Sequence, residues 1–152
     1  MAVLGELDTP LFQLAMQLGW LNQVGVAEED PEEPVYAFYH PTFEEYFAAC
    51  AIDDWRFFLT HVPDNPNAGI YRIFEPQWKE VILLWLGRED VAKEKKEEFI
   101  KALIEFDDGC WYFYKLQAYL LAAAGMAEFK DCSLREEIVG MIVDWSFSST
   151  YR

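Results

Sequence analysis

Residues 36–49, with the sequence YAFYHPTFEEYFAA, determine how the N-terminal part of this chain folds. The stretch starts within Val35–Tyr39, an apolar run that predicts a strand, and then turns sharply into an amphipathic helix. Thr42 is the expected N-cap of that helix, and Glu45, three residues later, completes a capping box. Five largely apolar side chains then recur at the spacing of one helix face: Phe43, Tyr46, Phe47, Cys50 and Ala51.

The residues before this stretch predict a helix followed by a hairpin. Thr9 and Pro10 are typical of an N-cap and a first helical residue, and Gly19 marks the end of the helix. Its apolar face is expected to hold Leu11, Leu14, Ala15 and Leu18. Trp20–Ala27 predicts a strand, and the acidic loop Glu28–Pro34 joins it to the next one. A helix and a hairpin form the second half of a winged helix, so we assign residues 1–54 to a partial winged-helix module.

The remainder, residues 55–152, predicts an antiparallel α-helical array. Trp55–Leu59 is short, apolar and expected to be helical, whereas His61–Gly69 has the composition of a loop. Every segment from Pro76 onward predicts a helix. Helices paired by short turns are typical of HEAT-like repeats, although no internal repeat is visible. We therefore expect a mainly α fold with a partial winged helix and a small β-hairpin, followed by this array.

Apolar spacing predicts which faces of these helices are buried. One stripe, ended by Gly87, consists of Trp78, Val81, Ile82, Trp85 and Leu86. Lys93–Phe106 has an inner face of Phe99, Ile100, Leu103 and Phe106. Its outer face is charged and consists of Lys93, Glu94, Lys96, Glu97 and Lys101. The tryptophans at helical spacing are expected in the core: Trp78, Trp85, Trp111 and Trp145.

Two later segments complete the array. Trp111–Met126 is apolar almost all round, which predicts a central buried helix. Ser133–Glu136 has the pattern of a second capping box. It is expected to start a helix with one apolar face, made of Ile138, Met141, Ile142 and Trp145.

The charge distribution excludes several classes of partner. The formal net charge is −15, no lysine or arginine precedes Arg56, and eleven acids lie between Glu6 and Asp54. Binding of nucleic acid requires cations that neutralise phosphates, and anionic membrane surfaces require the same. We therefore expect neither a nucleic-acid partner nor a membrane partner.

The net charge makes this an acidic protein, and its cysteine usage and hydropathy indicate that it is cytoplasmic. The three cysteines, Cys50, Cys110 and Cys132, have no CxxC spacing and are expected to be buried free thiols. No secretory leader is evident, and the longest apolar run, Ala118–Ala127, is too short to cross a bilayer.

No pattern of residues predicts catalysis. The chain has no GxxxxGK[ST], GxSxG or HExxH motif, and its two histidines, His40 and His61, fall in different predicted parts. Asp107–Cys110 lacks the later ligands of a calcium loop and is interpreted as a turn between helices. A Cys–His pair stays open on sequence alone, but Cys50 falls on an apolar face. We predict a non-enzyme with no catalytic residue, no metal site and no cofactor of its own.

His40 has two possible roles. A histidine between a strand and a helix N-terminus usually forms hydrogen bonds to the backbone of the turn. Its imidazole can also donate to an anion. The position of His40 between a strand and a helix, taken alone, favours the structural role.

The segment FYHPTFEEYFAA, residues 38–49, resembles the F-x-H-x-T-F-Q-E-Y-F-A-A signature of NACHT proteins, a family of signalling NTPases. It departs from the signature at Glu44, where glutamine is usual. Leu18–Leu21 is similar to the helix-to-strand junction of the family. Tyr71–Gly87 resembles the helical linker that precedes HEAT-type repeats in cyanobacterial members. The resemblance spans most of the chain.

The resemblance implies a function as well as a fold. In NACHT proteins the histidine at the position of His40 contacts the diphosphate of bound ADP and holds the closed state. The chain would then be a non-catalytic regulatory and interaction region that couples nucleotide state to ligand sensing. Its partners would be a NACHT nucleotide-binding domain in cis, which binds ADP or ATP, and downstream helical repeats or a protein partner. The alternative is a free-standing helical protein–protein interaction module with an aromatic face rimmed by acids.

Overall fold

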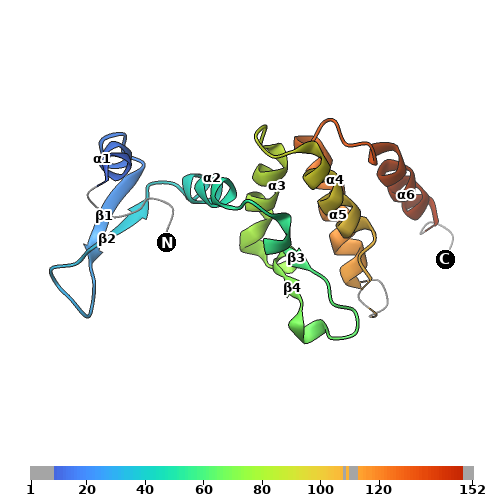
Figure 1. Ribbon diagram of the computed structural model, residues 1–152, viewed down its shortest axis with the longest axis horizontal. Helices are drawn as coiled ribbons and strands as arrows, with labels where there is room; N and C mark the ends of the chain where they lie inside the picture. Colours follow the sequence, from blue (N-terminus) through green and yellow to red (C-terminus); the bar gives the residue numbers. More distant parts are fainter. Residues whose placement is uncertain (1–8, 108, 110–112, 149–152) are drawn as a thin grey trace. The chain divides into compact units, whose positions relative to one another are not determined.

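The computed structural model describes residues 9–107, 109 and 113–148, which fall into two compact units, Met1–Ala51 and Ile52–Arg152. These described residues form six α-helices and two antiparallel sheets of two strands each (Figure 1). The prediction of a mainly α fold with a small β-hairpin is confirmed.

The first helix, α1 (Pro10–Gln17), starts and stops as its sequence predicts. Thr9 is the N-cap, and its Oγ1 accepts a hydrogen bond from Phe12 N at 3.3 Å. Gly19 has φ of 72°, a left-handed conformation that costs glycine little and ends the helix. The buried face agrees only in part with the expected one: Ala15 is buried, as predicted, but Phe12 is buried as well, and Leu14 and Leu18 are exposed.

A hairpin of β1 (Leu21–Val26) and β2 (Pro34–Phe38) follows α1. Leu21 pairs with Phe38, and the register shifts between Gln23 and Gly25, where a bulge interrupts the ladder. The inner face of the hairpin packs on α1 through a small core of Phe12, Ala15 and Leu21, covered by Met16, Trp20, Tyr36 and Phe38. Phe12 and Tyr36 meet edge to face at 4.9 Å between ring centroids.

Helix α2 (Pro41–Ala51) packs on the hairpin through aromatic rings. Phe43 stacks on Trp20 at 5.8 Å between centroids, and Phe47 stacks on Phe38 at 5.6 Å. Both α2 residues belong to the apolar face predicted from the sequence. Because these contacts fix α2 against the end of β2, they also fix the junction between them.

The second unit begins with short elements that the sequence did not fully predict. A 3-10 turn, Trp55–Phe57, occupies most of the expected helix, and β3 (Leu59–Thr60) follows it. β3 pairs with β4 (Ile70–Tyr71), so the expected loop is flanked by a second, two-residue hairpin. Three further 3-10 turns are Pro66–Ala68, Arg72–Phe74 and Pro76–Trp78.

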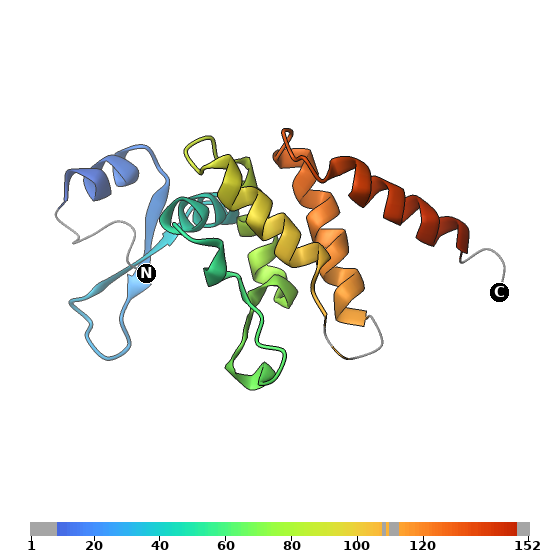
Figure 2. The same ribbon diagram turned by 45° about the vertical axis from the view of Figure 1, so that its right-hand side comes forward.

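Four helices make the body of this unit: α3 (Lys79–Gly87), α4 (Lys93–Ile104), α5 (Phe113–Glu128) and α6 (Arg135–Ser148) (Figure 2). The predicted inner faces of α3 and α4 are confirmed by the buried residues Val81, Ile82, Trp85, Leu86, Phe99, Ile100, Leu103 and Phe106. A Cβ atom at Gly125 of α5 would lie 2.5 Å from Leu86 Cδ1, so glycine permits the close approach of α5 to α3.

Backbone carbonyls join the start of this unit to its helices. The carbonyl of Ile52 accepts from Trp85 Nε1 at 2.8 Å and from Arg88 Nη1 at 2.9 Å. Trp85 is fully buried, as predicted, whereas Trp78 and Trp145 are only half-buried. Trp111 and Cys110 lie outside the described residues. Cys132 is buried and Cys50 is half-buried, and both are free thiols.

Lys96 was expected on the charged outer face of α4, and this prediction is wrong. Its side chain is only 7 % exposed. Nζ donates to the carbonyl of Arg88 and lies 5.3 Å from the centroid of the Phe129 ring. The long alkyl stem lets the charge reach a carbonyl at the end of α3 while the methylenes are buried, which apolar spacing does not reveal.

Two expectations about the last helices are also corrected. Ser133 does not cap α6, because its N–H and its hydroxyl both donate to the carboxylate of Glu97 on α4, the former at 2.9 Å, and α6 starts at Arg135. Helix α5 is not buried all round, since Phe113, Leu116 and Leu120 are exposed. Among the described residues, no helix has the length and apolar character needed to cross a membrane.

Candidate functional site

His40 lies at the junction between β2 and α2, where its ring caps the helix. Its Nδ1 accepts a hydrogen bond from Thr42 N at 3.2 Å and lies 2.9 Å from Thr42 Oγ1. The carbonyl of His40 accepts from Phe43 N at 3.0 Å. The predicted N-cap at Thr42 is therefore wrong, since the helix begins at Pro41 and Thr42 lies inside it. Proline suits the first helical position, because its missing N–H has no partner there, and this moves the cap to His40.

The capping bond determines which ring nitrogen carries the proton. Because Nδ1 accepts from a backbone N–H, the neutral ring carries its hydrogen on Nε2. His40 is exposed, and within the described chain Nε2 has no protein partner. An outward N–H donor at the N-terminus of an 11-residue helix is suited to an anion, which the helix dipole also favours.

The surroundings of His40 do not complete an anion site. No lysine or arginine precedes Arg56, so the first unit offers no cation to neutralise a phosphate. Glu44 lies in the first turn of α2 and adds negative charge there. The junction can donate one hydrogen bond to an anion but cannot hold a diphosphate by itself.

His61, the other histidine, belongs to the second unit and has structural contacts. Its Nδ1 lies 3.2 Å from the hydroxyl of Tyr71, and its ring lies 4.6 Å from that of Phe106. The two histidines fall in different units, His40 in the first and His61 in the second. The described residues contain no group of histidine, cysteine and acidic side chains that could hold a metal ion.

A cleft of about 680 Å³ lies at the end of α3, beside the first turn of α4 and the last turn of α5. Its wall carries lysines and acids together, and Lys96 is the buried lysine among them. Burial lowers the pKa of Lys96, the direction expected when a cation loses water. Because its Nζ already donates to the Arg88 carbonyl, Lys96 has a structural role in this cleft.

The outer side of the second unit carries a set of exposed apolar residues that the sequence analysis did not predict. They are Phe113, Leu116 and Leu120 on α5 and Val139 and Val143 on α6, and we call them the α5–α6 face. Their exposed fractions range from 44 % to 62 %. The sequence signal was the apolar character of α5 on all sides, which we interpreted as complete burial.

No protein-family model, curated protein or solved structure matches this chain. Two features of the described residues are candidates for a functional role. One is the donor at His40, and the other is the α5–α6 face.

Proposed function

We propose that this chain is a non-catalytic regulatory and interaction region of a NACHT-type signalling NTPase. The first unit would act as the end of a winged helix that contacts the nucleotide-binding domain. The second would be a HEAT-like linker that transmits the nucleotide state to a ligand-sensing region. The protein would act in the cytoplasm.

The observation that carries this proposal is the geometry of His40. Its Nδ1 is held by Thr42, so a hydrogen-bond donor, Nε2–H, faces outward at a helix N-terminus. A phosphate oxygen of ADP is a suitable acceptor for that donor. The likeness of residues 38–49 to the NACHT signature supports the same role for His40.

The same geometry explains why the role requires a second domain. The lysine and the phosphate-binding loop would come from the nucleotide-binding domain in cis, because the first unit has no cation. ADP would connect the two domains in the closed state. Exchange for ATP would release the winged helix as a rigid body, which is a common form of switching.

Calorimetric titration of ADP and ATP tests this role. We expect no binding to residues 1–152 alone. In a longer protein that includes the nucleotide-binding domain, His40→Ala should weaken ADP binding roughly ten- to hundredfold, the loss expected for one charge-assisted hydrogen bond. Tight binding of ADP by residues 1–152, or unchanged affinity in the His40→Ala protein, would show that the proposal is wrong.

A second candidate function is a free-standing helical protein–protein interaction module. The α5–α6 face favours it, because exposed apolar residues that gather on one surface commonly mark an interaction site. Both candidates assign binding of a protein segment to the second unit. They differ in whether a nucleotide controls it.

A further inference from the structure

The α5–α6 face consists of two helix stripes that lie side by side. Tyr119 of α5 contacts Trp145 of α6 at 4.8 Å between ring centroids. Arg135, the first residue of α6, donates to the carbonyl of Met126 near the end of α5 at 2.8 Å. The two helices therefore run in opposite directions, and Figure 2 shows α6 turning back from the end of α5.

This antiparallel arrangement places both apolar stripes on the same side of the helix pair. Tyr119, which contacts Trp145 of α6, is buried, and so is Ile138 on α6. The next residue in each helix, Leu120 or Val139, is rotated by about 100° in the same sense about its own axis. In antiparallel neighbours, equal rotations away from the contact lead to the same side. The exposed Leu120 and Val139 thus border a single surface.

The spacing and chemistry of this surface suit a third helix. Phe113, Leu116 and Leu120 follow helical spacing on α5, and Val139 and Val143 are one turn apart on α6. None of the five side chains is charged, although all are exposed. Two adjacent apolar stripes of this kind offer a surface on which the apolar side of an amphipathic helix can pack.

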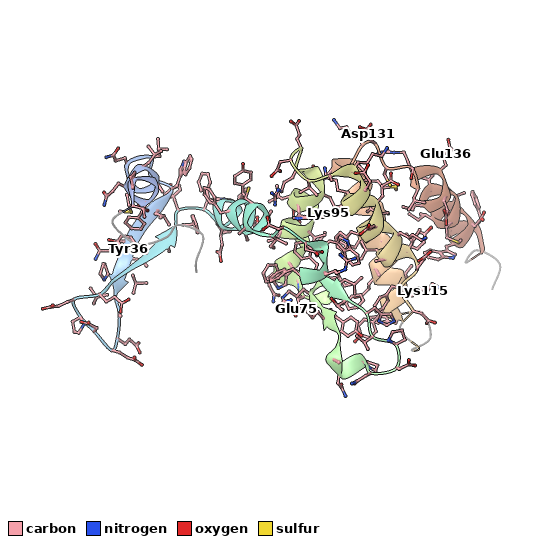
Figure 3. All side chains as sticks on the ribbon, viewed as in Figure 1. Tyr36, Glu75, Lys95, Lys115, Asp131 and Glu136 are labelled. Atoms are coloured by element: carbon pink, nitrogen blue, oxygen red, sulfur yellow. The ribbon has the colours of Figure 1, made fainter. Side chains whose placement is uncertain are left out.

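The charge of this chain indicates which kind of helix can bind to the α5–α6 face. Glu136 and Glu137 lie in the first turn of α6, and the guanidinium of Arg135 beside them donates to the carbonyls of Met126 and Lys130. Figure 3 labels Lys115 on α5 and Glu136 on α6. The whole chain has a net charge of −15, so a second copy would bring strong repulsion to this surface. A helix with lysine or arginine beside its apolar stripe would be attracted instead.

We propose that the α5–α6 face binds an amphipathic helix of another protein, with an apolar stripe flanked by lysine or arginine. Leu120 is the central anchor on α5, and Val143 contributes from α6. This inference rests on the interaction role proposed for the second unit and does not depend on the role of His40. It names the chemistry of the partner, which the proposed function leaves open.

A synthetic peptide tests this inference on the full 152-residue chain. The probe is a helix of about 18 residues, long enough for five turns, with leucines on one face and lysines beside them. A matched peptide replaces each lysine with glutamate, and a third carries the same residues in scrambled order. Calorimetry in dilute buffer and in added salt measures the affinity of each.

We expect the lysine peptide to bind, the glutamate peptide to bind at least about tenfold more weakly, and added salt to weaken the lysine peptide. Leu120→Ser should reduce the affinity by about tenfold or more, as for a central interface anchor. Val24→Ser, at an exposed valine in the first unit, is the control and should have no effect. Circular dichroism checks that both variants keep their helices.

Three results would overturn the inference. They are no binding of the lysine peptide, binding that is unaffected by Leu120→Ser, and equal binding of all three peptides. Analytical ultracentrifugation supplies a fourth, since a dimer that Leu120→Ser dissociates would make a second copy the occupant. The nucleotide titrations above are separate measurements, so failure here leaves the role of His40 to be judged on its own test.

Discussion

His40 caps α2, and in the proposed function it also presents a donor to a phosphate; one pair of substitutions distinguishes these two roles. His40→Ala removes both the ring acceptor of the Thr42 N–H and the outward Nε2–H. His40→Asp keeps an acceptor at the cap, because a carboxylate is among the preferred N-cap groups. The same carboxylate would repel a phosphate. The aspartate variant should therefore keep the helix start and lose the anion contact.

The size of the capping effect follows from the geometry of the junction. The ring accepts one backbone N–H at 3.2 Å, and the site is exposed, so water can partly replace the lost bond. We expect His40→Ala to destabilise the first turn of α2 by about 0.7 kcal/mol, at the low end for loss of a cap. This corresponds to roughly threefold faster amide hydrogen exchange there. His40→Asp should exchange at the wild-type rate or more slowly.

Hydrogen exchange measured by NMR resolves the relevant amides, chiefly those of Thr42 and Phe43. Thr9→Ala is the matched control, because Thr9 caps α1 through its side chain, and its effect should be confined to α1. Equal exchange in wild type and His40→Ala would refute the capping role. Exchange in His40→Asp as fast as in His40→Ala would show that the ring stabilises the junction by some other contact.

Two further predictions concern the second unit. Leu103→Ala should lower the free energy of unfolding by about 2–5 kcal/mol in urea denaturation, because the Leu103 side chain is fully buried. Leu120→Ala should change it by less than about 1 kcal/mol, because Leu120 is exposed. Equal losses in the two variants would contradict the assigned core. Hydrogen bonds from Ser133 lower the pKa of Glu97 below its ordinary value of 4.5, so Glu97 stabilises the fold above that pH and the contribution is lost as pH falls through the folded-state pKa. Acid titration of stability should be shallower in Glu97→Gln than in wild type, and an unchanged slope would count against the Ser133 contact.

Apolar spacing correctly predicted which faces of α3 and α4 are buried. The inner residues of α4, such as Phe99 and Leu103, are buried where the 3.6-residue period places them. The start of α1 was also predicted correctly, because Thr9 as the N-cap and Pro10 as the first helical residue act locally, on the helix that begins there. These features depend on local geometry, which a single sequence contains.

Features that depend on distant partners were missed. Ser133 has the local pattern of a cap, but its N–H and its hydroxyl both donate to the carboxylate of Glu97, 36 residues away. Lys96 has the position of a surface residue, but the carbonyl of Arg88 and the Phe129 ring hold it inside. At α2, the proline at the first helical position moved the cap from Thr42 to His40.

The candidate sites show the same division. Sequence identified His40 and its alternative roles, since a histidine between a strand and a helix is visible without coordinates. The α5–α6 face was not identified, because composition alone cannot show which side of an apolar helix lacks neighbours. Contacts such as Tyr119 with Trp145 were needed to place the two stripes together.

Sequencing the full-length transcript that encodes these 152 residues tests the proposed regulatory role most directly. We predict a continuous reading frame that encodes a Gly-rich phosphate-binding loop with its lysine before this region and further helical segments after it. A reading frame that begins and ends with these residues would contradict the role in a NACHT-type NTPase and leave the helical interaction module as the function.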